Sequence, residues 1–409
     1  MPGSSEDFVI IARRYLLVLN IPYFVDNAGR TFLERTWYRD LIQHLHYIPS
    51  FTLAAPRQAM PADTTTLVAI EECYRKNLTL VPLPSQTSRT RSFAELFRTF
   101  RTLWRAVGDA EIVHTGIGGW PYPLGWLASP IARLRRKKLL VVVESSPWRI
   151  TEKADKTVSL RSRLEAKIYE CLARYWCSKA DLAFYTQSAY RNQFHRDGIG
   201  PAYITPATWV NDEDIVDDVK AADLWKEKML GPVRFLFAGR LVPEKGVNVL
   251  LDAVAKLNED GVEGELHVIG DGPLRDAVVA ADRAGRFRLR YFEPLPYGDL
   301  FLNFLQHYHA VVVPSLSDEQ PRIVFDAAAR AVAVLASATD GLRPYVEDGF
   351  TGRLVPVGNT NTLAEAMRSG VCDPNILRSF AMEALTRVRG KTHRGMHAER
   401  SRIIARHLG

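Results

Sequence analysis

Short hydrophobic runs alternate along the chain with longer segments in which apolar positions recur every three or four residues. In the first half, runs of strand length occur at residues 15–20, 51–54, 78–83, 111–115, 139–144 and 182–186. Segments with helical spacing lie between them, at residues 31–46, 92–106, 122–137 and 159–178. Alternating strands and helices are typical of a parallel sheet covered by helices on both faces. The pattern therefore predicts a doubly wound α/β domain.

The alternation stops at residues 211–230, a polar and acidic segment without a strand-like run, and then starts again. The second set of runs lies at residues 233–237, 265–269, 288–292, 311–313 and 334–336. A chain of 409 residues also exceeds what one hydrophobic core usually serves. We therefore expect two doubly wound domains, at 1–210 and 231–380, with a linker at 211–230. A basic helical tail at 381–409 follows, either separate or packed back on the first domain.

Composition places the chain among ordinary globular proteins, with 47% hydrophobic and 24% charged residues. Its four cysteines have no paired metal-binding spacing, so we expect free thiols in a reducing compartment. The N-terminal stretch has no basic start before an apolar run, and no stretch reaches about 18 consecutive apolar residues. These features predict a cytoplasmic protein without a signal peptide or a membrane span.

Positive charge is moderate in amount, a net +7, but clustered along the chain. Residues 133–138 read RLRRKK, and the tail from Arg387 onward is rich in arginine. Such clusters suit acidic partners: phosphates, nucleic acid or an anionic membrane surface. The sequence has no zinc spacing, helix-turn-helix signal or aromatic-basic RNA motif, so nucleic acid is not the expected partner.

A predicted helix at 93–105 combines aromatic residues with arginines. Phe93, Phe97, Phe100 and Trp104 follow helical spacing, and arginines lie beside them. Such a stripe usually packs into the core while the arginines are solvated. The alternative is an interfacial helix that touches anionic lipid, which would make the protein peripheral at the inner face of the membrane.

Ligands of open α/β sheets bind at the carboxyl ends of the strands, so chemistry is sought in the loops that follow them. The first such loop of the second domain reads AGRLVPEKG and contains Arg240 and Lys245. Guanidinium and ammonium groups suit phosphate oxygens. The next strand ends in GDGP at 270–273, which does not continue into a dinucleotide-binding fingerprint and is interpreted as a plain strand-to-helix turn.

The segment 311–335, VVVPSLSDEQPRIVFDAAARAVAVL, predicts a strand, a helix opened by Pro321 and the next strand. A helix N-terminus attracts phosphates. Asp318 lies in the loop before this helix and Asp326 more than one turn into it. This arrangement suits a ligand with both phosphate and hydroxyl groups. Alternatively, Asp318 only caps the helix and Asp326 is solvated.

Four ordered motifs of the second domain resemble the C-terminal domain of glycosyltransferase family 4. They read FAGRLVPEKGVNVLLDAVAKL, LHVIGDGPLRDAV, VVVPSLSDEQPRIVFDAAARAVAVLAS and GLRPYVEDGFTGRLVPVGN. The resemblance implies the GT-B architecture, two Rossmann-like doubly wound domains facing each other across a cleft. It also implies a retaining, metal-independent glycosyltransferase that moves a sugar from a UDP- or GDP-linked donor to a glycan or lipid-linked saccharide.

The resemblance also implies roles for individual residues of the second domain. Arg240 and Lys245 would hold the donor diphosphate, and Gly239 would let the backbone approach it. Asp318 would face the donor sugar hydroxyls, and Asp326 the nucleotide ribose. The backbone N–H groups that complete the phosphate cradle would be those of Arg322, Ile323 and Val324.

The chain departs from the family at these carboxylates. Asp318 and Asp326 stand where the family has glutamates, and each is one methylene shorter. Glu319 replaces the glycine that usually follows the first of them. Either Asp318 or Glu319 therefore takes the first carboxylate's role.

A D-x-D triplet, Asp212-Glu213-Asp214, matches a metal–diphosphate signature found in glycosyltransferases of another fold. It lies in the acidic run of the predicted linker, where we expect a solvated surface. With cationic side chains to neutralise the leaving diphosphate, the resemblance implies no metal and no cofactor besides the donor.

The first domain offers three candidates at strand ends. Gly29 remains from the glycine-rich loop that the family places near the donor phosphates. His114 is either a hydrogen-bonded core residue or a site residue. Glu144 stands where many family members present a histidine to the donor sugar, so it either serves the sugars or only caps Arg149 or Lys153.

In this family the first domain receives the acceptor, which the resemblance suggests is a saccharide, often linked to a polyprenyl carrier that stays in the bilayer. Two other functions remain open. One is a nucleotide-sugar epimerase or hydrolase of the same fold, and the other is a non-catalytic polyanion-binding protein, suggested by the basic clusters.

Overall fold

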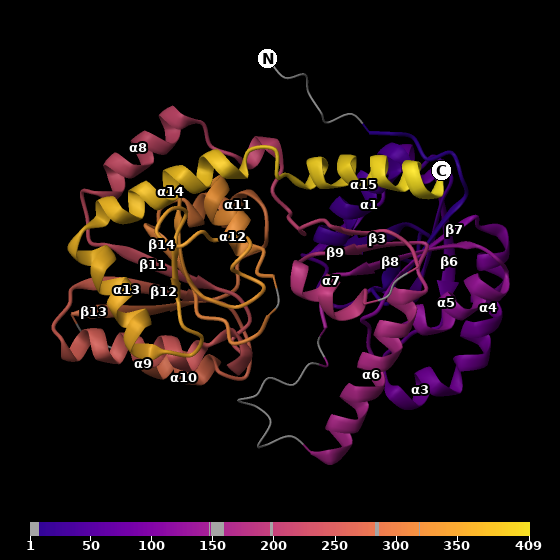
Figure 1. Ribbon diagram of the computed structural model, residues 1–409, viewed down its shortest axis with the longest axis horizontal. Coiled ribbons are helices and arrows are strands. Elements are labelled where there is room, and N and C mark those ends of the chain that lie inside the picture. Colours follow the sequence, from indigo (N-terminus) through magenta and orange to yellow (C-terminus); the bar gives the residue numbers. More distant parts are fainter. Residues whose placement is uncertain (1–7, 147, 149–158, 197–198, 283–285, 319) are drawn as a thin grey trace. The chain divides into compact units, whose positions relative to one another are not determined.

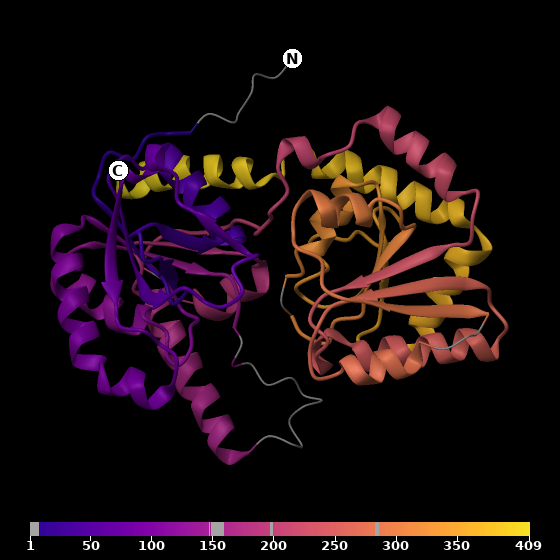
Figure 2. The same cartoon turned by 180° about the vertical axis from the view of Figure 1, so that it is seen from behind.

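The computed structural model describes residues 8–146, 148, 159–196, 199–282, 286–318 and 320–409. The chain divides into two compact units, which Figures 1 and 2 show from opposite sides. The first unit comprises Met1–Ala207 and Arg394–Gly409, and the second comprises Thr208–His393. Each contains a mainly parallel sheet with helices on both faces, so the predicted pair of Rossmann-like α/β domains is confirmed.

The sheet of the first unit has ten strands in the order β10-β9-β8-β7-β1-β4-β2-β3-β5, with β6 paired to β4. Its parallel core consists of β1 (Tyr15–Val18), β4 (Phe51–Ala59), β6 (Leu78–Leu83), β7 (Ile112–Gly116), β8 (Lys138–Val143), β9 (Leu182–Tyr185) and β10 (Ala202–Ile204). Three short strands extend it: β2 (Tyr23–Val25), β3 (Thr31–Glu34) and β5 (Leu67–Ala69). The strands of the parallel core lie close to the predicted hydrophobic runs, except for the short β10, which was not predicted.

Helices cover both faces of this sheet because successive strand residues point to opposite sides. Its helices are α1 (Arg35–Tyr47), α2 (Glu72–Arg75), α3 (Arg89–Ala94), α4 (Leu96–Asp109), α5 (Gly125–Leu134), α6 (Leu160–Ser178), α7 (Ser188–Phe194) and α15 (His393–Leu408). Leu16 and Val141 pack with α4 to α7, whereas Leu17 and Leu140 pack with α1 and α15. The last helix of the chain thus forms part of the core of the first unit.

The segment predicted as one helix from residue 31 begins as strand β3 instead. Phe32 pairs with Phe24 of β2 in an antiparallel hairpin, and helix α1 starts only at Arg35. The carboxylate of Glu34 accepts a hydrogen bond from the backbone N–H of Thr36 at 3.1 Å and so caps the helix. The apolar spacing continued across this boundary, which is why the sequence did not separate the two elements.

The sheet of the second unit is parallel, in the order β13-β12-β11-β14-β15-β16. The strands are β11 (Arg234–Ala238), β12 (Gly264–Ile269), β13 (Phe287–Phe292), β14 (Ala310–Val313), β15 (Ala333–Ser337) and β16 (Arg353–Val355). The helices are α8 (Asp218–Lys228), α9 (Val247–Glu259), α10 (Arg275–Ala281), α11 (Asp299–Leu305), α12 (Ile323–Ala329), α13 (Thr360–Cys372) and α14 (Pro374–Val388). All but the last strand match predicted runs to within a residue.

The predicted linker at 211–230 contains a packed helix. In α8, Ala221 and Trp225 are fully buried in the core of the second unit, and Lys228 is 2% exposed. Apolar residues are too sparse here to form a run, but they share one face of the helix. Charged residues on the other faces made the segment look like a solvated linker.

The acidic triplet before α8 is only partly solvated. Asp212 and Glu213 are exposed in the 3₁₀ helix η2 (Asp212–Asp214), but Asp214 is 3% exposed. Its carboxylate accepts from the N–H of Asn211 at 2.9 Å and lies 3.9 Å from the guanidinium of Arg330. The expectation of a solvated triplet is therefore wrong for Asp214, which has a structural role.

The aromatic residues of the predicted helix at 93–105 are exposed, not packed in the core. Phe97 is 76% exposed and Trp104 is 39% exposed. The buried side of α4 is formed by Thr99, Leu103, Ala106 and Val107. Because Leu103 and Val107 already supply the core contacts, the aromatic stripe lies on the surface beside the arginines.

Candidate functional site

Three loops at the carboxyl ends of the second sheet are held together by close backbone contacts. Gly246 ends the short 3₁₀ helix η3 (Pro243–Lys245) with a φ of 73°. A Cβ atom at this position would lie 1.8 Å from the carbonyl oxygen of Pro314. The N–H of Leu316 donates to the carbonyl of Glu244 at 2.8 Å. The loop carrying Lys245 is thus joined to the loop that leads to Asp318.

The GDGP turn at 270–273 packs against the loop that carries Arg240, in addition to connecting a strand to a helix. A Cβ atom on Gly270 would lie 1.9 Å from the carbonyl oxygen of Gly239. The N–H of Leu241 donates to the carbonyl of Asp271 at 2.8 Å. The two glycine-bearing loops therefore pack backbone to backbone, and this contact fixes the segment that carries Arg240.

The predicted phosphate ligands are accessible at this edge of the sheet. Arg240 is exposed, while Lys245 and Asp318 are half-buried. The contacts of Gly246 with Pro314 and of Leu316 with Glu244 join the loop of Lys245 to the loop that leads to Asp318, and binding of one ligand by both residues stays a prediction. The rival carboxylate Glu319 lies outside the described residues.

Helix α12 begins at Ile323, two residues later than the predicted start at Pro321. Asp326 consequently lies in its first turn, not beyond it. The guanidinium of Arg322 stacks on the ring of Trp209 at 4.6 Å, which fixes the chain at the start of the helix. Val324 is buried and Ile323 half-buried, so this helix end is tied to the core.

Asp326 is 4% exposed, and the alternative of a solvated carboxylate is therefore wrong. The hydroxyl of Tyr297 donates to its Oδ1 at 2.8 Å. A buried carboxylate is costly unless polar groups contact it. The Tyr297 hydrogen bond also fixes the direction of the carboxylate, a feature that the sequence did not indicate.

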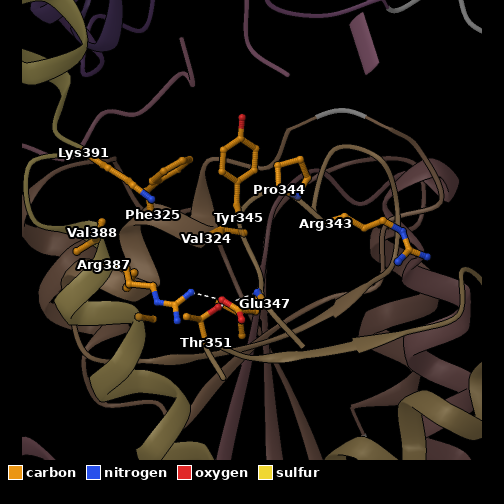
Figure 3. Close-up of a pocket in the computed structure, with 13 residues that line it drawn as sticks. Val324, Phe325, Arg343, Pro344, Tyr345, Glu347, Thr351, Arg387, Val388 and Lys391 are labelled. Carbon is orange, nitrogen blue, oxygen red and sulfur yellow. Dashed lines mark hydrogen bonds and ion pairs between the residues drawn. The ribbon is translucent and has the colours of Figure 1, made fainter. Parts of the chain in front are cut away.

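Residues of α12 and α14 in the same unit line a cavity of about 260 Å³ (Figure 3). Phe325 and Tyr345 line it, and an ion pair between Arg387 and Glu347 crosses its wall. Arg240, Lys245, Asp318 and Asp326 are not among its lining residues. Val324, whose backbone N–H is one of the predicted donor contacts, does line this cavity, so the cavity adjoins that part of the predicted site.

In the first unit a cavity of about 270 Å³ opens at the carboxyl ends of β1, β7 and β8. Glu144 and Ser145, which follow β8, and Gly118 and Gly119, which follow β7, line it. Asn20 donates to the carbonyl of Tyr122 at 2.9 Å and accepts from the N–H of Leu124 at 3.0 Å. The predicted candidate Glu144 therefore lies in a walled cavity; its alternative partners Arg149 and Lys153 lie outside the described residues.

His114 is both a hydrogen-bonded residue of the sheet and a lining residue of this cavity. Its Nδ1 is hydrogen-bonded to the hydroxyl of Tyr15 at 2.9 Å. Burial lowers the pKa of His114 well below its ordinary value, and the nearby His44 and Arg400 act in the same direction. The imidazole is therefore neutral, and it can accept or donate hydrogen bonds without adding charge.

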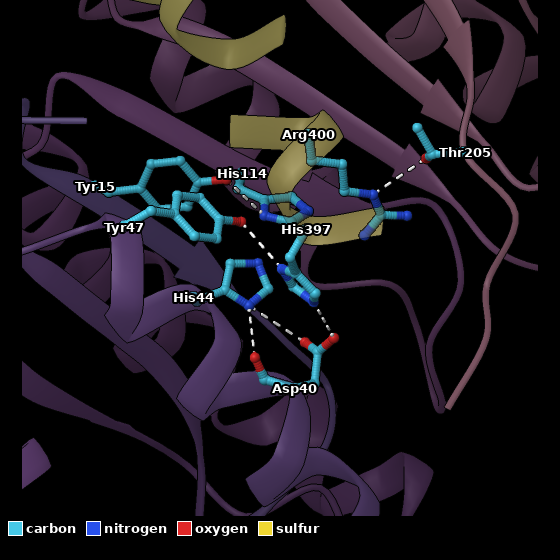
Figure 4. Close-up of polar contacts among 8 residues, drawn as sticks. All are labelled: Tyr15, Asp40, His44, Tyr47, His114, Thr205, His397 and Arg400. Carbon is cyan, nitrogen blue, oxygen red and sulfur yellow. Dashed lines mark hydrogen bonds and ion pairs between the residues drawn. The ribbon is translucent and has the colours of Figure 1, made fainter. Parts of the chain in front are cut away.

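A polar cluster missed in the sequence lies beside His114 (Figure 4). Asp40 and His44 come from α1, and His397 and Arg400 come from α15. His397 lies between Tyr47 and Asp40, at 3.2 Å from the hydroxyl and 3.1 Å from the carboxylate. The contacting residues are more than 300 positions apart in the chain, so no local motif could reveal them.

Gly29 lies in the turn of the β2–β3 hairpin, with a φ of 79°. The carboxylate of Asp26 closes this turn by accepting from the N–H groups of Ala28 at 3.0 Å and Arg30 at 2.8 Å. The positive φ explains a glycine here without any ligand. Its predicted phosphate contact stays a prediction.

Several side chains of the predicted basic cluster at 133–138 make contacts within the first unit. Arg133 pairs with Asp181 at 3.0 Å, and Lys137 donates to the carbonyl of Gly108 at 2.7 Å. Arg135 lies over the Trp104 ring at 5.2 Å, which joins the cluster to the aromatic stripe of α4. No helix in the described part of the chain has both the length and the apolar character needed to cross a membrane.

Residues 232–373 match the family model described as glycosyl transferases group 1. Among curated proteins, the chain is 27% identical over 152 residues to alpha-D-kanosaminyltransferase of Streptomyces kanamyceticus, covering 36% of this chain and 39% of that protein. It is 33% identical over 156 residues to D-inositol 3-phosphate glycosyltransferase of Rhodococcus jostii strain RHA1, which covers 36% of this chain and 34% of that protein. The matches thus span well under half the length of these relatives.

Solved structures match over nearly the whole chain. Sucrose-phosphate synthase from Thermosynechococcus elongatus superposes with a TM-score of 0.70 at 17% identity, covering 96% of this chain and 99% of that one. Anabaena HepE in complex with UDP-glucose superposes with a TM-score of 0.64 at 13% identity, and the match covers 96% of this chain and 99% of that one. At such low identity this likeness concerns the fold, which is that of GT-B glycosyltransferases. The resemblance to group 1 glycosyltransferases is thereby confirmed, and residues 232–373 are the part of the chain that carries it.

Proposed function

We propose that this protein is a retaining glycosyltransferase of family 4 that transfers a sugar from a UDP- or GDP-linked donor to a glycan or lipid-linked saccharide. One observation carries the proposal. Within the stretch that matches group 1 glycosyltransferases, the contact of Gly246 with Pro314 joins the loop of Lys245 to the loop of Asp318.

The donor diphosphate would bind Arg240 and Lys245. Negative charge develops on the leaving diphosphate during transfer, so fixed cations stabilise the transition state more than the bound donor. The N–H groups at residues 322–324 would add hydrogen bonds to the same phosphates. These contacts can take the place of a metal ion, and we propose a mechanism without one.

The donor's sugar and ribose would bind the two aspartates. Asp318 is half-buried beside the Lys245 loop and would accept from sugar hydroxyls. Asp326, whose direction the Tyr297 hydroxyl fixes, would accept from the ribose. A UDP-linked donor gains support from the Anabaena neighbour, whose structure holds UDP-glucose.

The acceptor would bind the cavity of the first unit. Glu144 lines it together with Gly118 and Gly119, and a carboxylate there can accept hydrogen bonds from a saccharide. It would hold the acceptor hydroxyl on the face of the donor sugar from which the diphosphate leaves, as retention of configuration requires. The proton of that hydroxyl would pass to the departing phosphate oxygen, so Glu144 need not act as a base.

We also propose that the enzyme works in the cytoplasm and associates with the inner face of the membrane. Its four cysteines are free, as in a reducing compartment. Phe97 is 76% exposed on α4, the helix that also carries exposed arginines. Exposed aromatic residues beside cations suit the interface of an anionic bilayer, where a polyprenyl-linked acceptor resides.

The proposal is tested by incubating the full-length protein with a panel of UDP- and GDP-sugars, with and without saccharide acceptors. Nucleoside diphosphate released mainly in the presence of one acceptor, together with a product of retained anomeric configuration by NMR, is the expected result. Release that is independent of every acceptor would identify a hydrolase, and release from no donor would contradict the proposal.

A further inference from the structure

The cavity of the first unit contains a buried arginine whose hydrogen bonding is incomplete. Arg400 of α15 is 5% exposed and lines this cavity together with His44 and His114. Its Nε donates to Thr205 Oγ1 at 3.1 Å. Its Nη2 is buried and has no hydrogen-bond partner among the described residues. Figure 4 shows the guanidinium between Thr205 and the histidines.

The guanidinium is held in a defined orientation. One edge is bonded to Thr205, and the group lies 5.5 Å from the centre of the Phe184 ring. An arginine stays charged at all ordinary pH values and cannot remove the unused donor by losing a proton. A buried donor left without a partner costs about 1–3 kcal/mol, and more on a charged group. A fixed, charged donor of this kind is suited to an incoming acceptor atom.

Two carboxylates, those of Asp40 and Glu144, line the cavity together with Arg400. The Asp40 carboxylate lies 3.1 Å from His397 Nε2 and 3.4 Å from His44 Nδ1, so histidines contact it. Arg400 is also the one arginine or lysine among the lining residues.

We propose that this cavity recognises an oxyanion, a phosphate or carboxylate group carried by the acceptor, through the guanidinium of Arg400. A guanidinium pairs with a carboxylate or phosphate through charge-assisted hydrogen bonds, which are about twice as strong as those between two neutral groups. Because Glu144 lines the same cavity, the hydroxyl groups of the ligand face Glu144 and its anionic group faces Arg400. The inference depends on the proposed function solely in identifying the ligand as the sugar acceptor.

The test uses the full-length Arg240→Ala/Lys245→Ala protein, from which the proposed donor-phosphate contacts have been removed. Inorganic phosphate and acetate are titrated separately at constant ionic strength, with NaCl as the balancing salt, and Tm is measured. A bound anion stabilises the folded state, so Tm should rise with at least one of them. Adding Arg400→Met should raise the dissociation constant at least about tenfold.

Arg406→Met is the matched control, because Arg406 is exposed on the same helix, and it should leave the dissociation constant unchanged. Arg400→Lys covers the case in which Arg400→Met does not fold. It keeps the charge but lacks the planar fork, so the dissociation constant should still rise at least about threefold. A response to phosphate assigns a phosphate-bearing ligand, and a response to acetate alone assigns a carboxylate.

The proposal is overturned if neither anion raises Tm, or if the Arg400 variants respond like their parent. Binding of UDP to a protein with intact Arg240 and Lys245 is measured separately. Absence of nucleotide binding there would contradict the proposed donor site and would leave the result for Arg400 unaffected.

Discussion

The α-carbon of Gly246 faces the carbonyl oxygen of Pro314 so closely that a Cβ atom would lie 1.8 Å from that oxygen. No real Cβ approaches a backbone oxygen at this distance, so any other residue would separate the two loops. Lys245 precedes the glycine and Asp318 follows the proline in the chain. This glycine, together with the hydrogen bond from Leu316 to Glu244, therefore holds the loops of the proposed phosphate and sugar contacts against each other.

The first prediction is that Gly246→Ala weakens nucleotide binding as well as stability. Gly349 is the matched control, since it has a φ of 79° and nothing within 4 Å of its missing Cβ. Gly349→Ala should cost about 1–2 kcal/mol from the left-handed conformation alone. Gly246→Ala should cost more in urea unfolding, and calorimetry should show UDP affinity reduced at least about tenfold. Equal effects of the two variants would contradict the proposed role of the contact.

The second prediction concerns the cations of the donor site. Arg240→Ala or Lys245→Ala removes a contact that strengthens as the diphosphate leaves, so kcat should fall at least about a hundredfold. Arg288→Ala, at an exposed position of β13, should leave kcat near the wild-type value. Steady-state kinetics with the best donor of the panel would measure this, and near-normal turnover in both site variants would refute the assignment.

The third prediction concerns the orientation of Asp326. Tyr297→Phe removes the 2.8 Å hydrogen bond to its carboxylate and should weaken nucleoside diphosphate binding about three- to tenfold. Asp326→Ala should weaken it more strongly. Tyr308→Phe removes a hydroxyl that contacts His267 at 2.6 Å elsewhere in the same unit, and it should change stability without changing affinity. Unaltered binding in Tyr297→Phe would show that Asp326 needs no such support.

The fourth prediction is a pH dependence of stability caused by Lys228. Burial lowers the pKa of Lys228 to about 7, and Arg234 contributes in the same direction. In the unfolded chain the amine binds its proton up to about pH 10.4. Between these values the unfolded state holds the extra proton, so the free energy of unfolding rises with pH, by at most about 1.4 kcal/mol per unit.

Between pH 7 and pH 9, the free energy of unfolding of wild type should therefore rise by up to about 2–3 kcal/mol relative to that of Lys228→Met. Lys226→Met, at an exposed position of the same helix, should track wild type. Urea unfolding at pH 7, 8 and 9 provides the comparison. Parallel curves for wild type and Lys228→Met would mean that the buried amine is charged in both states or neutral in both.

The parallel cores of both units could be predicted because buried parallel strands are continuous apolar runs. The run at 78–83 coincides with β6, and most others match within a residue or two. The hairpin strands β2 and β3 were missed, since they have three and four residues and only partial burial. Helix α8 was missed because Ala221 and Trp225 are too few to form a run, although they bury its inner face.

The sequence placed Arg240, Lys245 and Asp318 in loops that follow strands, and the structure has them after β11 and β14, which are neighbours in the sheet. The candidate site was not predictable where contacts join distant parts of the chain. Tyr297 reaches Asp326 across 29 positions, and His397 reaches Asp40 across 357. Pairing at such distances is decided by the topology of the sheet and by helix packing, and a single sequence contains no local signal for it.

The last prediction concerns the membrane surface. Phe97 is 76% exposed on α4, and Arg98, Arg101 and Arg105 are exposed on the same helix. Each arginine near an anionic leaflet contributes about 1 kcal/mol, an attraction that fades within a Debye length. The full-length protein should therefore co-sediment with phosphatidylglycerol vesicles at low salt, and about 0.5 M NaCl should release it.

Phe97→Ser should weaken this binding because it removes apolar surface that would enter the interface, and replacing the three arginines by Gln should weaken it further. Leu230→Ser is the matched control, since Leu230 is 89% exposed and belongs to the second unit, not to α4. If Leu230→Ser weakens binding as much as Phe97→Ser does, the contact surface lies elsewhere. Absence of binding to anionic vesicles at low salt would instead favour a soluble acceptor, because a saccharide on a lipid carrier can be reached solely by an enzyme that comes to the bilayer.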